Sequence, residues 1–429
     1  WLEACAVAPE GRANPRQLWL HPGSLDGHTE LVERIHAAAR RTMGAHFRPV
    51  LVLQLTHSGR YSKPEGVPAP RITHHSIIDA RSGVTPETPI LTDAYLDRLQ
   101  DAYVEAALLA QQAGFDAVDI KSCHRYLLSE LLASFTRDDS RYGGSLENRT
   151  RFLREVAAKI RRAAPGLEVT SRLNIYDALP YPYGWGVDRD DAARPDFTEP
   201  RQLIAQLVAL GYHGLNTTIG NPYYNPHFNR PFDFPIKGMY VPEEHPLETM
   251  ARFVGITRTV QDAFPDLAVV GSGYSWVRQF YPQVAAAVIA QGWATLVGLG
   301  RGALAYPDFA RDILETGRME ATKTCVTCSA CTQIMRDGGR SGCVVRDAEV
   351  YGPIYREGRR LSADHARALA QQCRLCATPT CRDHCPAGVD IPGFLGQIAE
   401  GDDRGAYAVL HAANPLPEIC AHVCPAEVQ

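Results

Sequence analysis

The sequence predicts an α/β protein in which a TIM-type (β/α)8 barrel precedes a small α-helical domain rich in cysteine. The barrel is indicated by short β-rich runs that alternate with long amphipathic runs between residues 49 and 302. The alternative fold, an open doubly wound sheet, should show a G-x-G-x-x-G turn after its first strand, and the sequence has none there. The separate C-terminal part is indicated by the cysteines, ten of twelve of which follow residue 324.

Seven runs have the composition of buried parallel strands. They are residues 2–9, 49–56, 115–121, 168–174, 214–220, 267–273 and 295–300. Helices are predicted between most of them, for example over residues 24–42 and over 93–114, where Asp93 would cap the start and Gly114 would end the helix. A closed barrel of this type has eight strands, so we expect the first strand to lie upstream of Trp1.

The composition argues against several classes of protein. The net charge of −4 and the pI near 6.4 give no basic field for nucleic acid, and no apolar run has the length of a membrane span. No signal peptide is recognisable at the start of the chain. The tight cysteine clusters are typical of metal ligation in a reducing compartment, so we expect a cytoplasmic protein, and we expect it to form a homo-oligomer.

Polar residues stand at the carboxyl ends of the predicted strands, which is where barrels of this type place their chemistry. These ends include residues 54–57, residues 121–126, Arg172 and Asn216. The last two strands end in glycine, one of them followed by an arginine, which suits a phosphate held by backbone N–H groups and a guanidinium. The alternative is that these glycines only let helices pack closely against the strands.

Four runs of the barrel resemble the old yellow enzyme family of FMN-dependent barrels. They are LEACAVAPEGR at 2–12, QLTHSGRYS at 54–62, the segment 114–152 that contains YGGSLENR, and GLGRGALAYPDF at 298–309. The resemblance implies that Ala4, Gln54 and Arg172 lie against the flavin ring, where the last two would stabilise the negative charge of the reduced flavin. It implies that the FMN phosphate is held by Gly271, Ser272, Gly273, Gly300 and Arg301.

The same resemblance implies a catalytic group of Lys121, His124 and Tyr126. Lys121 and His124 would hydrogen-bond the activating oxygen of the substrate, and Tyr126 would deliver a proton opposite the hydride from the flavin. The family has His or Asn at the position of Lys121, so a full charge here could favour a carboxylate, a thioester or another anionic acceptor. The alternative for Lys121 is a salt-bridged lysine that does not contact the substrate. The alternative for Tyr126 is an aromatic ring that only packs under the barrel rim. The aromatic loops 175–186 and 218–235 could shape the pocket or only rigidify the rim.

The first cysteine block has the spacing C-x2-C-x2-C-x11-C over residues 325–343. Zinc sites usually contain two separated pairs, whereas three closely spaced thiolates with a fourth nearby suit a [4Fe–4S] cluster. The barrel with this block resembles 2,4-dienoyl-CoA reductase and trimethylamine dehydrogenase, which implies Cys325, Cys328, Cys331 and Cys343 as ligands. The alternative is a set of free, buried cysteines.

The second block, within residues 373–429, resembles the iron–sulfur domain of the glutamate synthase small subunit and of dihydropyrimidine dehydrogenase. Helices are predicted over 391–402 and 403–414. The resemblance implies two clusters, with Cys373, Cys376 and Cys381 in one and Cys385 and Cys424 in the other, whereas Cys420 has no ligand role in the related domain and could be a buried thiol. Each cluster would need a further ligand beyond Gln429, where FAD- and NAD(P)H-binding domains would follow.

We therefore divide the chain into an FMN barrel over 1–318, a [4Fe–4S] segment over 319–350 and a double-[4Fe–4S] helical domain over 351–429, which is expected to be truncated. The expected activity is FMN-dependent reduction of an activated C=C bond in an enoate or enoyl thioester, with electrons relayed from the NAD(P)H-oxidising FAD domain. One alternative is oxidation of a methylated amine on the same barrel. Another is a non-catalytic electron-transfer or scaffold subunit.

Overall fold

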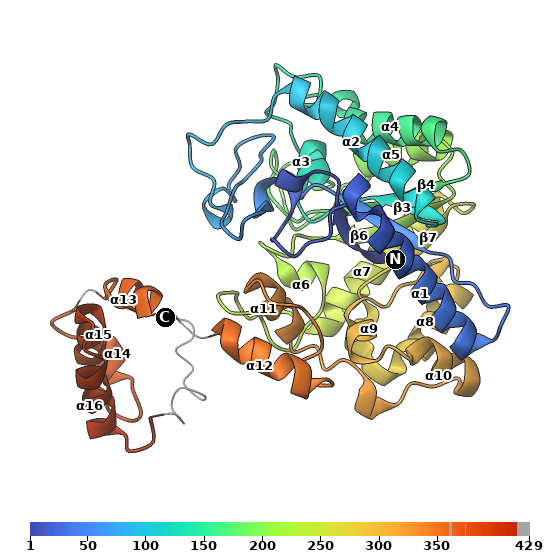
Figure 1. Ribbon diagram of the computed structural model, residues 1–429. Helices are drawn as coiled ribbons and strands as arrows, with labels where there is room; N and C mark the ends of the chain where they lie inside the picture. Colours follow the sequence, from blue (N-terminus) through green and yellow to red (C-terminus); the bar gives the residue numbers. More distant parts are fainter. Residues whose placement is uncertain (360–362, 374, 418–429) are drawn as a thin grey trace. The chain divides into compact units, whose positions relative to one another are not determined.

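The computed structural model describes residues 1–359, 363–373 and 375–417, and Figure 1 traces them along the chain. The described chain divides into two compact units. The larger unit contains residues 1–234, 241–329 and 345–347. The smaller unit contains residues 235–240 and 330–344 together with the described residues from 348 onward.

The larger unit is built on parallel strands in the order β1-β2-β3-β4 and β5-β6-β7-β8. The strands are β1 (Leu2–Ala6), β2 (Val52–Thr56), β3 (Ala117–Ile120), β4 (Glu168–Thr170), β5 (Arg172–Tyr176), β6 (Gly214–Ile219), β7 (Ala268–Gly271) and β8 (Leu296–Val297). Only Ser171 separates β4 from β5, and a parallel bridge from Ser122 to Leu173 links the end of β3 to β5. The two segments therefore form one bent strand, and each of the seven predicted runs contains a strand.

Helices join successive strands, as parallel pairing requires. They are α1 (Leu25–Met43), α2 (Asp93–Gln112), α3 (Leu127–Leu132), α4 (Leu146–Ala163), α5 (Thr198–Ala209), α6 (Pro226–Asn229), α7 (Pro246–Ala263) and α8 (Tyr281–Ala290), and α9 (Arg301–Ala305) and α10 (Phe309–Thr316) follow β8. In Figure 1, α2, α4 and α5 lie on the outside of the strands, and α4 packs against both of the others. The predicted helix–strand alternation is thus confirmed.

One predicted helix cap is wrong by a residue. The Oγ1 of Thr92, not Asp93, caps α2 by accepting from the backbone N–H of Tyr95 at 3.2 Å. The Asp93 carboxylate instead accepts from Arg137 and Ser140, because these long-range donors come within reach once the barrel is folded. Gly114 follows the end of α2 with φ +93°, which is the left-handed conformation expected of a terminating glycine.

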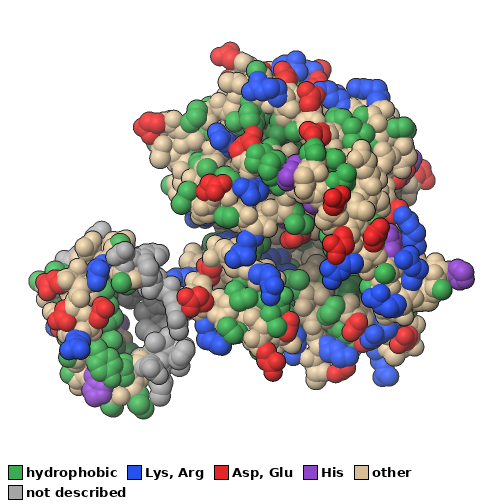
Figure 2. Space-filling view, in the orientation of Figure 1, with side chains coloured by type: hydrophobic (Ala, Val, Ile, Leu, Met, Phe, Trp, Pro, Cys, Tyr) green, Lys and Arg blue, Asp and Glu red, His purple; other side chains and the backbone are tan. Residues whose placement is uncertain are grey.

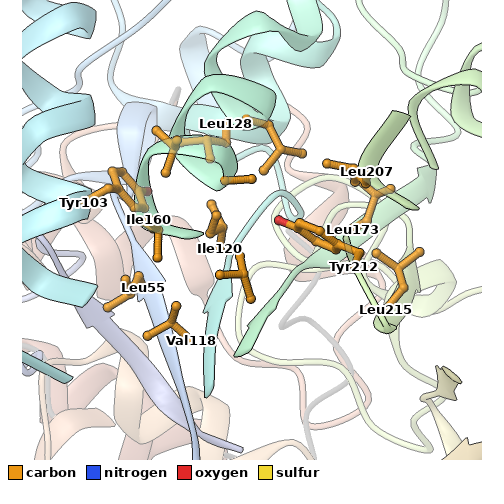
Figure 3. Close-up of a cluster of buried hydrophobic side chains, with 14 of the residues drawn as sticks. Leu55, Tyr103, Val118, Ile120, Leu128, Ile160, Leu173, Leu207, Tyr212 and Leu215 are labelled. Atoms are coloured by element: carbon orange, nitrogen blue, oxygen red, sulfur yellow. The ribbon is translucent and has the colours of Figure 1, made fainter. Parts of the chain in front are cut away.

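Side chains alternate along the strands between an apolar outer face and a polar inner face. Figure 3 shows outward strand side chains packed with those of the surrounding helices; its labelled members are Leu55, Tyr103, Val118, Ile120, Leu128, Ile160, Leu173, Leu207, Tyr212 and Leu215. The residues between these strand positions are polar, as with Gln54, Asp119, Arg172 and Asn216. The hydrophobic core therefore lies between strands and helices, and polar side chains face the interior of the barrel.

The smaller unit is helical. Its helices are α11 (Ala330–Arg336), α12 (Ala348–Arg359), α13 (Ala363–Ala370), α14 (Thr380–Asp383), α15 (Ile391–Glu400) and α16 (Asp403–Ala413). Asp390 and Asp402 cap α15 and α16 by accepting backbone N–H groups. Pro392 lies in the first turn of α15 and Gly401 ends that helix with φ +82°, so both predicted helices are present.

The surface of the larger unit mixes both signs of charge on the face shown in Figure 2, where Lys and Arg side chains are interspersed with Asp and Glu. Within the described ranges, no helix combines the length and the apolar character needed to cross a bilayer.

Candidate active site

A buried carboxylate, Asp119, organises the floor of the site. One of its oxygens accepts from Gln54 Nε2 at 2.9 Å and from Trp1 Nε1 at 2.8 Å, and the other accepts from the backbone N–H of Arg172 at 2.6 Å. Burial raises the pKa of Asp119, and the hydrogen bond from Gln54 opposes that rise. Asp119 therefore holds Gln54 and the start of β5 in place, and its inward position follows from the alternation of β3.

Lys121 is a buried cation at the end of β3. Its side chain carries a pKa lowered to about 8, chiefly because burial disfavours the ammonium. The ammonium nitrogen lies 3.9 Å from the centroid of the Tyr126 ring, a cation–π distance. It makes no hydrogen bond or ion pair with another residue of the described chain. The alternative of a salt-bridged lysine is therefore not what the structure shows.

His124 is held as a neutral imidazole. Its Nε2 lies 3.0 Å from Asn229 Nδ2, which can only donate, so Nε2 is the acceptor and the proton is on Nδ1. The pKa of His124 lies well below its usual range because of burial and then because of the nearby Arg172 and Lys121. Next to a charged Lys121, His124 thus offers a neutral donor.

The backbone of this loop is strained at two consecutive residues, His124 with φ +65° and Arg125 with φ +57°. Arg125 anchors the loop, because its buried guanidinium contacts Asp177 at 3.4 Å and the His74 ring at 3.3 Å. Burial raises the pKa of Asp177 to about 6, and Arg125 opposes that rise. The anchor fixes the direction of His124 and Tyr126 on either side of it.

Tyr126 is a buried phenol whose hydroxyl lies 3.1 Å from the hydroxyl of Tyr223. The ring of Tyr223 stacks on that of Tyr61 with centroids 3.8 Å apart and planes inclined by 19°. Burial raises the pKa of Tyr126 well above its usual value, so the resting group carries its proton. The structure therefore brings Lys121, His124 and Tyr126 together as one group.

The remaining predicted flavin contacts lie within β1, at the start of β5 and at or just after the ends of β7 and β8. Two buried guanidinium nitrogens, Nε of Arg172 and Nη1 of Arg301, have no partner among the described residues, as donors awaiting an anion would. At Gly271 an added Cβ would come within 2.8 Å of the Tyr274 hydroxyl, and Gly273 has φ +94°. The residues therefore fit a phosphorylated, anionic group such as FMN.

The other residues predicted to contact the flavin are Ser272, Ala4 and Gly300, and they have fewer close neighbours that restrict them. Ser272 Oγ donates to Asn216 Oδ1 at 3.1 Å, and the carbonyl of Ala4 accepts from Gln17 at 2.7 Å. A Cβ at Gly300 would meet nothing within 4 Å, so this glycine is not required for close packing. The alternative role of these glycines in close helix packing applies to Gly271 and Gly273 but not to Gly300.

The described cysteines of both blocks form no disulfide with one another. Cys325, Cys328, Cys331, Cys343, Cys373, Cys381 and Cys385 are partly exposed and Cys376 is exposed, whereas Cys420 and Cys424 lie outside the described residues. Four closely spaced thiols per block are a suitable donor set for iron–sulfur clusters. Within the described ranges, no three His, Cys, Asp or Glu side chains are gathered as a metal site requires. The ligand assignments therefore stay predictions.

Sequence reasoning missed several residues of the site. Asn229 and Tyr223 come from the aromatic loop 218–235, more than 90 positions from their partners, and nothing local marks them. Asp233, in the same loop, accepts from Thr327 at 2.8 Å and from Trp276 at 2.9 Å. It thereby ties the first cysteine segment to the turn after β7. Asp119 could have been predicted from the sequence, because Asp119 and Lys121 are polar residues that alternate with the apolar Val118 and Ile120 along the strand.

Comparisons with known proteins agree with the fold and with the two kinds of domain. Residues 2–181 match the NADH:flavin oxidoreductase / NADH oxidase family, and residues 355–429 match dihydropyrimidine dehydrogenase domain II, 4Fe-4S cluster. The NADPH dehydrogenase of Halalkalibacterium halodurans is 37% identical over 168 residues, which are 38% of this chain and 45% of that protein. The cinnamate reductase of Clostridium sporogenes is 27% identical over 331 residues, which are 74% of this chain and 44% of that protein.

Among solved structures, the complex of 2-naphthoyl-CoA reductase with 2-naphthoyl-CoA is similar with a TM-score of 0.61 and 18% identity. The match covers 96% of this chain and 61% of that one, and it supports the fold. The chain spans about half the length of the curated relatives, 45% and 44% of the two named above.

The larger unit has the barrel fold of old yellow enzyme-type proteins. Residues 2–181 match the NADH:flavin oxidoreductase / NADH oxidase family and residues 355–429 match a 4Fe-4S domain, so the matched segments are those of an FMN- and iron–sulfur-dependent oxidoreductase. FMN and a 4Fe-4S cluster are accordingly its implied cofactors. Both family resemblances and the predicted barrel are confirmed.

Proposed function

We propose that the chain reduces an activated C=C bond of an α,β-unsaturated acid or thioester. The observation that carries the proposal is the grouping of three donors, the Lys121 ammonium, the His124 imidazole and the Tyr126 phenol, at the end of β3. Reduction of such a bond builds negative charge on the activating oxygen and needs a proton at the α-carbon. The three groups supply both requirements.

Each residue has a separate task in this reaction. The Lys121 ammonium and the Nδ1–H of His124 would bind and polarise the carbonyl or carboxylate oxygen, and Tyr126 would give its proton to the α-carbon. Gln54 and Arg172 would lie against the FMN ring, with Arg301 and the glycines of the turn after β7 at its phosphate. When bound there, FMN supplies the hydride.

The supply of electrons is also part of the proposal. The two cysteine blocks would hold [4Fe–4S] clusters that carry single electrons to the barrel from an NAD(P)H-oxidising FAD domain. The FAD domain is proposed as part of the same polypeptide or as a separate partner, in a cytoplasmic homo-oligomer without nucleic acid or membrane. The name of the cinnamate reductase relative supports an enoate as the acceptor.

The test uses anaerobic protein with its flavin and clusters. Dithionite-reduced protein is mixed with cinnamate, crotonyl-CoA or cyclohexenone, and the return of the oxidised flavin spectrum is followed by stopped flow. We expect reoxidation by cinnamate or crotonyl-CoA, and a loss of about 10²-fold or more in Tyr126→Phe. Bleaching of oxidised protein by trimethylamine, without reoxidation by any alkene, would instead support amine oxidation. A purified protein without flavin bands would support the non-catalytic alternative.

A further inference from the structure

The proton donor of the proposed reaction is poorly placed to exchange its proton with water. Tyr126 is 8% exposed, and its raised pKa favours the neutral phenol. After a proton is given to the substrate, the phenolate must regain one before the next turnover. Within the described chain its hydroxyl has one hydrogen-bond partner, the hydroxyl of Tyr223 at 3.1 Å.

The other polar groups near Tyr126 are directed elsewhere. The Lys121 ammonium lies over the ring, 3.9 Å from its centroid, and forms a cation–π contact with its face. The Nε2 of His124 accepts a hydrogen bond from Asn229 at 3.0 Å, and Nδ1 is reserved for the substrate oxygen in the proposed reaction. Neither group therefore replaces Tyr223 as the immediate source of a proton.

Tyr223 is held firmly in this position. Its backbone N–H donates to Asn221 Oδ1 at 2.9 Å, and its ring stacks on Tyr61 at 3.8 Å. Asn221 Nδ2 in turn donates to the Tyr61 hydroxyl at 3.2 Å, so one asparagine fixes both aromatic residues. Tyr223 is only partly buried, whereas Tyr126 is buried, so Tyr223 has more access to solvent than the residue that it would re-protonate.

We propose that Tyr223 is the proton-relay residue that recharges Tyr126. The O–H bond of Tyr126 breaks as its proton goes to the substrate α-carbon. The Tyr223 hydroxyl then passes its proton to the Tyr126 oxygen, and water or a buffer acid restores the proton of Tyr223. One proton enters from solvent per substrate reduced, and no electron moves in this sequence. The inference rests on the proposed function, because it needs Tyr126 as a proton donor.

The test is Tyr223→Phe, which keeps the ring that stacks on Tyr61 and removes only the hydroxyl. With dithionite in excess as the electron source, we expect the multiple-turnover reduction of excess cinnamate to slow about tenfold or more in Tyr223→Phe, with the half-saturating cinnamate concentration little changed. The first reoxidation of the flavin uses the proton already on Tyr126 and should keep its rate. In D2O the turnover of the variant should slow more than that of the wild type, because re-protonation of Tyr126 then limits the rate. Tyr224→Phe is the matched control in the same loop, since its ring contacts Arg81 rather than Tyr126.

The outcomes separate the relay from the reaction it serves. Equal rates and equal isotope dependence in wild type and Tyr223→Phe would overturn the relay while leaving the alkene reduction intact. A rise confined to the half-saturating concentration would also overturn it, because it would show a role in pocket shape. Wild-type protein that no alkene reoxidises would contradict the proposed function, and the relay with it.

A second substitution avoids any loss of folding or flavin. Replacing Tyr223 by 3,5-difluorotyrosine keeps the ring and the hydroxyl but makes the phenol more acidic. The relay predicts that the high-pH limb of the rate profile moves to lower pH in this variant. An unchanged pH profile would overturn the proposal.

Discussion

At the scale of single residues, Lys121 is the costliest group in the site. A buried ammonium without an acceptor lowers stability, because the charge has left water without compensation. Its pKa of about 8 in the folded protein lies below the ordinary 10.5. Between these values the unfolded chain binds more protons than the folded one, so stability rises with pH in that window. The anion-binding role proposed for Lys121 would account for a residue kept at this cost.

Lys121→Met should therefore stabilise the barrel and weaken substrate binding together. We expect the free energy of unfolding at pH 7 to rise by up to about 3 kcal/mol, the equivalent of the lowered pKa. Thermal unfolding should be measured at pH 7 and pH 10. The wild type should become more stable between these two pH values, and Lys121→Met should not show this gain. Lys159→Met, a change on an exposed helix, is the control.

The same residue predicts how ligand binding depends on pH. Calorimetry with 3-phenylpropanoate, a saturated carboxylate that cannot react, should show affinity falling as the pH rises through about 8, where Lys121 loses its charge. In Lys121→Met the affinity should be at least tenfold lower at pH 7 and nearly independent of pH. Wild-type affinity retained by Lys121→Met would show that the ammonium does not contact the anion.

At the scale of elements, the sequence predicted the site residues at the ends of strands but not those on the loops that complete the site. Residues 121–126 directly follow a β-rich run, so the barrel rule alone places Lys121 and Tyr126 at the catalytic end. Tyr223 and Asn229 reach the same place from an irregular loop after β6. The course of such a loop depends on tertiary contacts, and its eighteen residues carry no periodicity from which those contacts could be predicted.

The turn after β7 gives a prediction about FMN itself. Gly273 has φ +94°, and an added Cβ would lie 3.1 Å from the Phe253 ring, so Gly273→Ala must displace this turn. We expect purified Gly273→Ala to retain much less FMN per chain, measured from the ratio of flavin to protein absorbance.

Gly317→Ala is the matched control for this experiment. Gly317 also has a positive φ, +68°, but a Cβ there would meet nothing within 4 Å and the residue ends α10. It should suffer a similar backbone strain of about 1 kcal/mol and keep its FMN. Equal FMN loss in both variants would mean that general destabilisation, not the turn after β7, releases the cofactor.

At the scale of the whole molecule, the two kinds of domain follow from the sequence because each carries its own local signature. The cysteine spacing and YGGSLENR are read within short windows; YGGSLENR lies in the first matched family and the second cysteine block in the other, whereas the first cysteine block lies in neither matched segment. The interleaving of the two units could not be predicted. Residues 235–240 belong to the smaller unit and 345–347 to the larger, and such assignments depend on contacts between distant segments.

Asp233 illustrates the same point with one side chain. It accepts from Trp276 and Arg278 in the turn after β7 and from Thr327 between two predicted cluster ligands. Burial would raise the pKa of Asp233, but these hydrogen bonds outweigh it and the pKa is lowered. The carboxylate thus joins the predicted phosphate site to the first cysteine segment through contacts that no sequence pattern reveals.

The last prediction concerns the iron content of the two cysteine blocks. If each block binds its own cluster, a substitution in one block should not remove iron from the other. Cys328→Ser and Cys376→Ser each remove one predicted ligand, and each variant purified anaerobically should lose about four iron atoms and the matching acid-labile sulfide. Cys5→Ala removes a buried thiol of the barrel core and should keep all the iron. Because the Cys328 segment is tied to the turn after β7 through Asp233, Cys328→Ser should also slow flavin reduction by NAD(P)H when the proposed NAD(P)H-oxidising FAD domain is present. Dithionite should still reduce that flavin, and undiminished iron in Cys328→Ser would show that this block is not a cluster site.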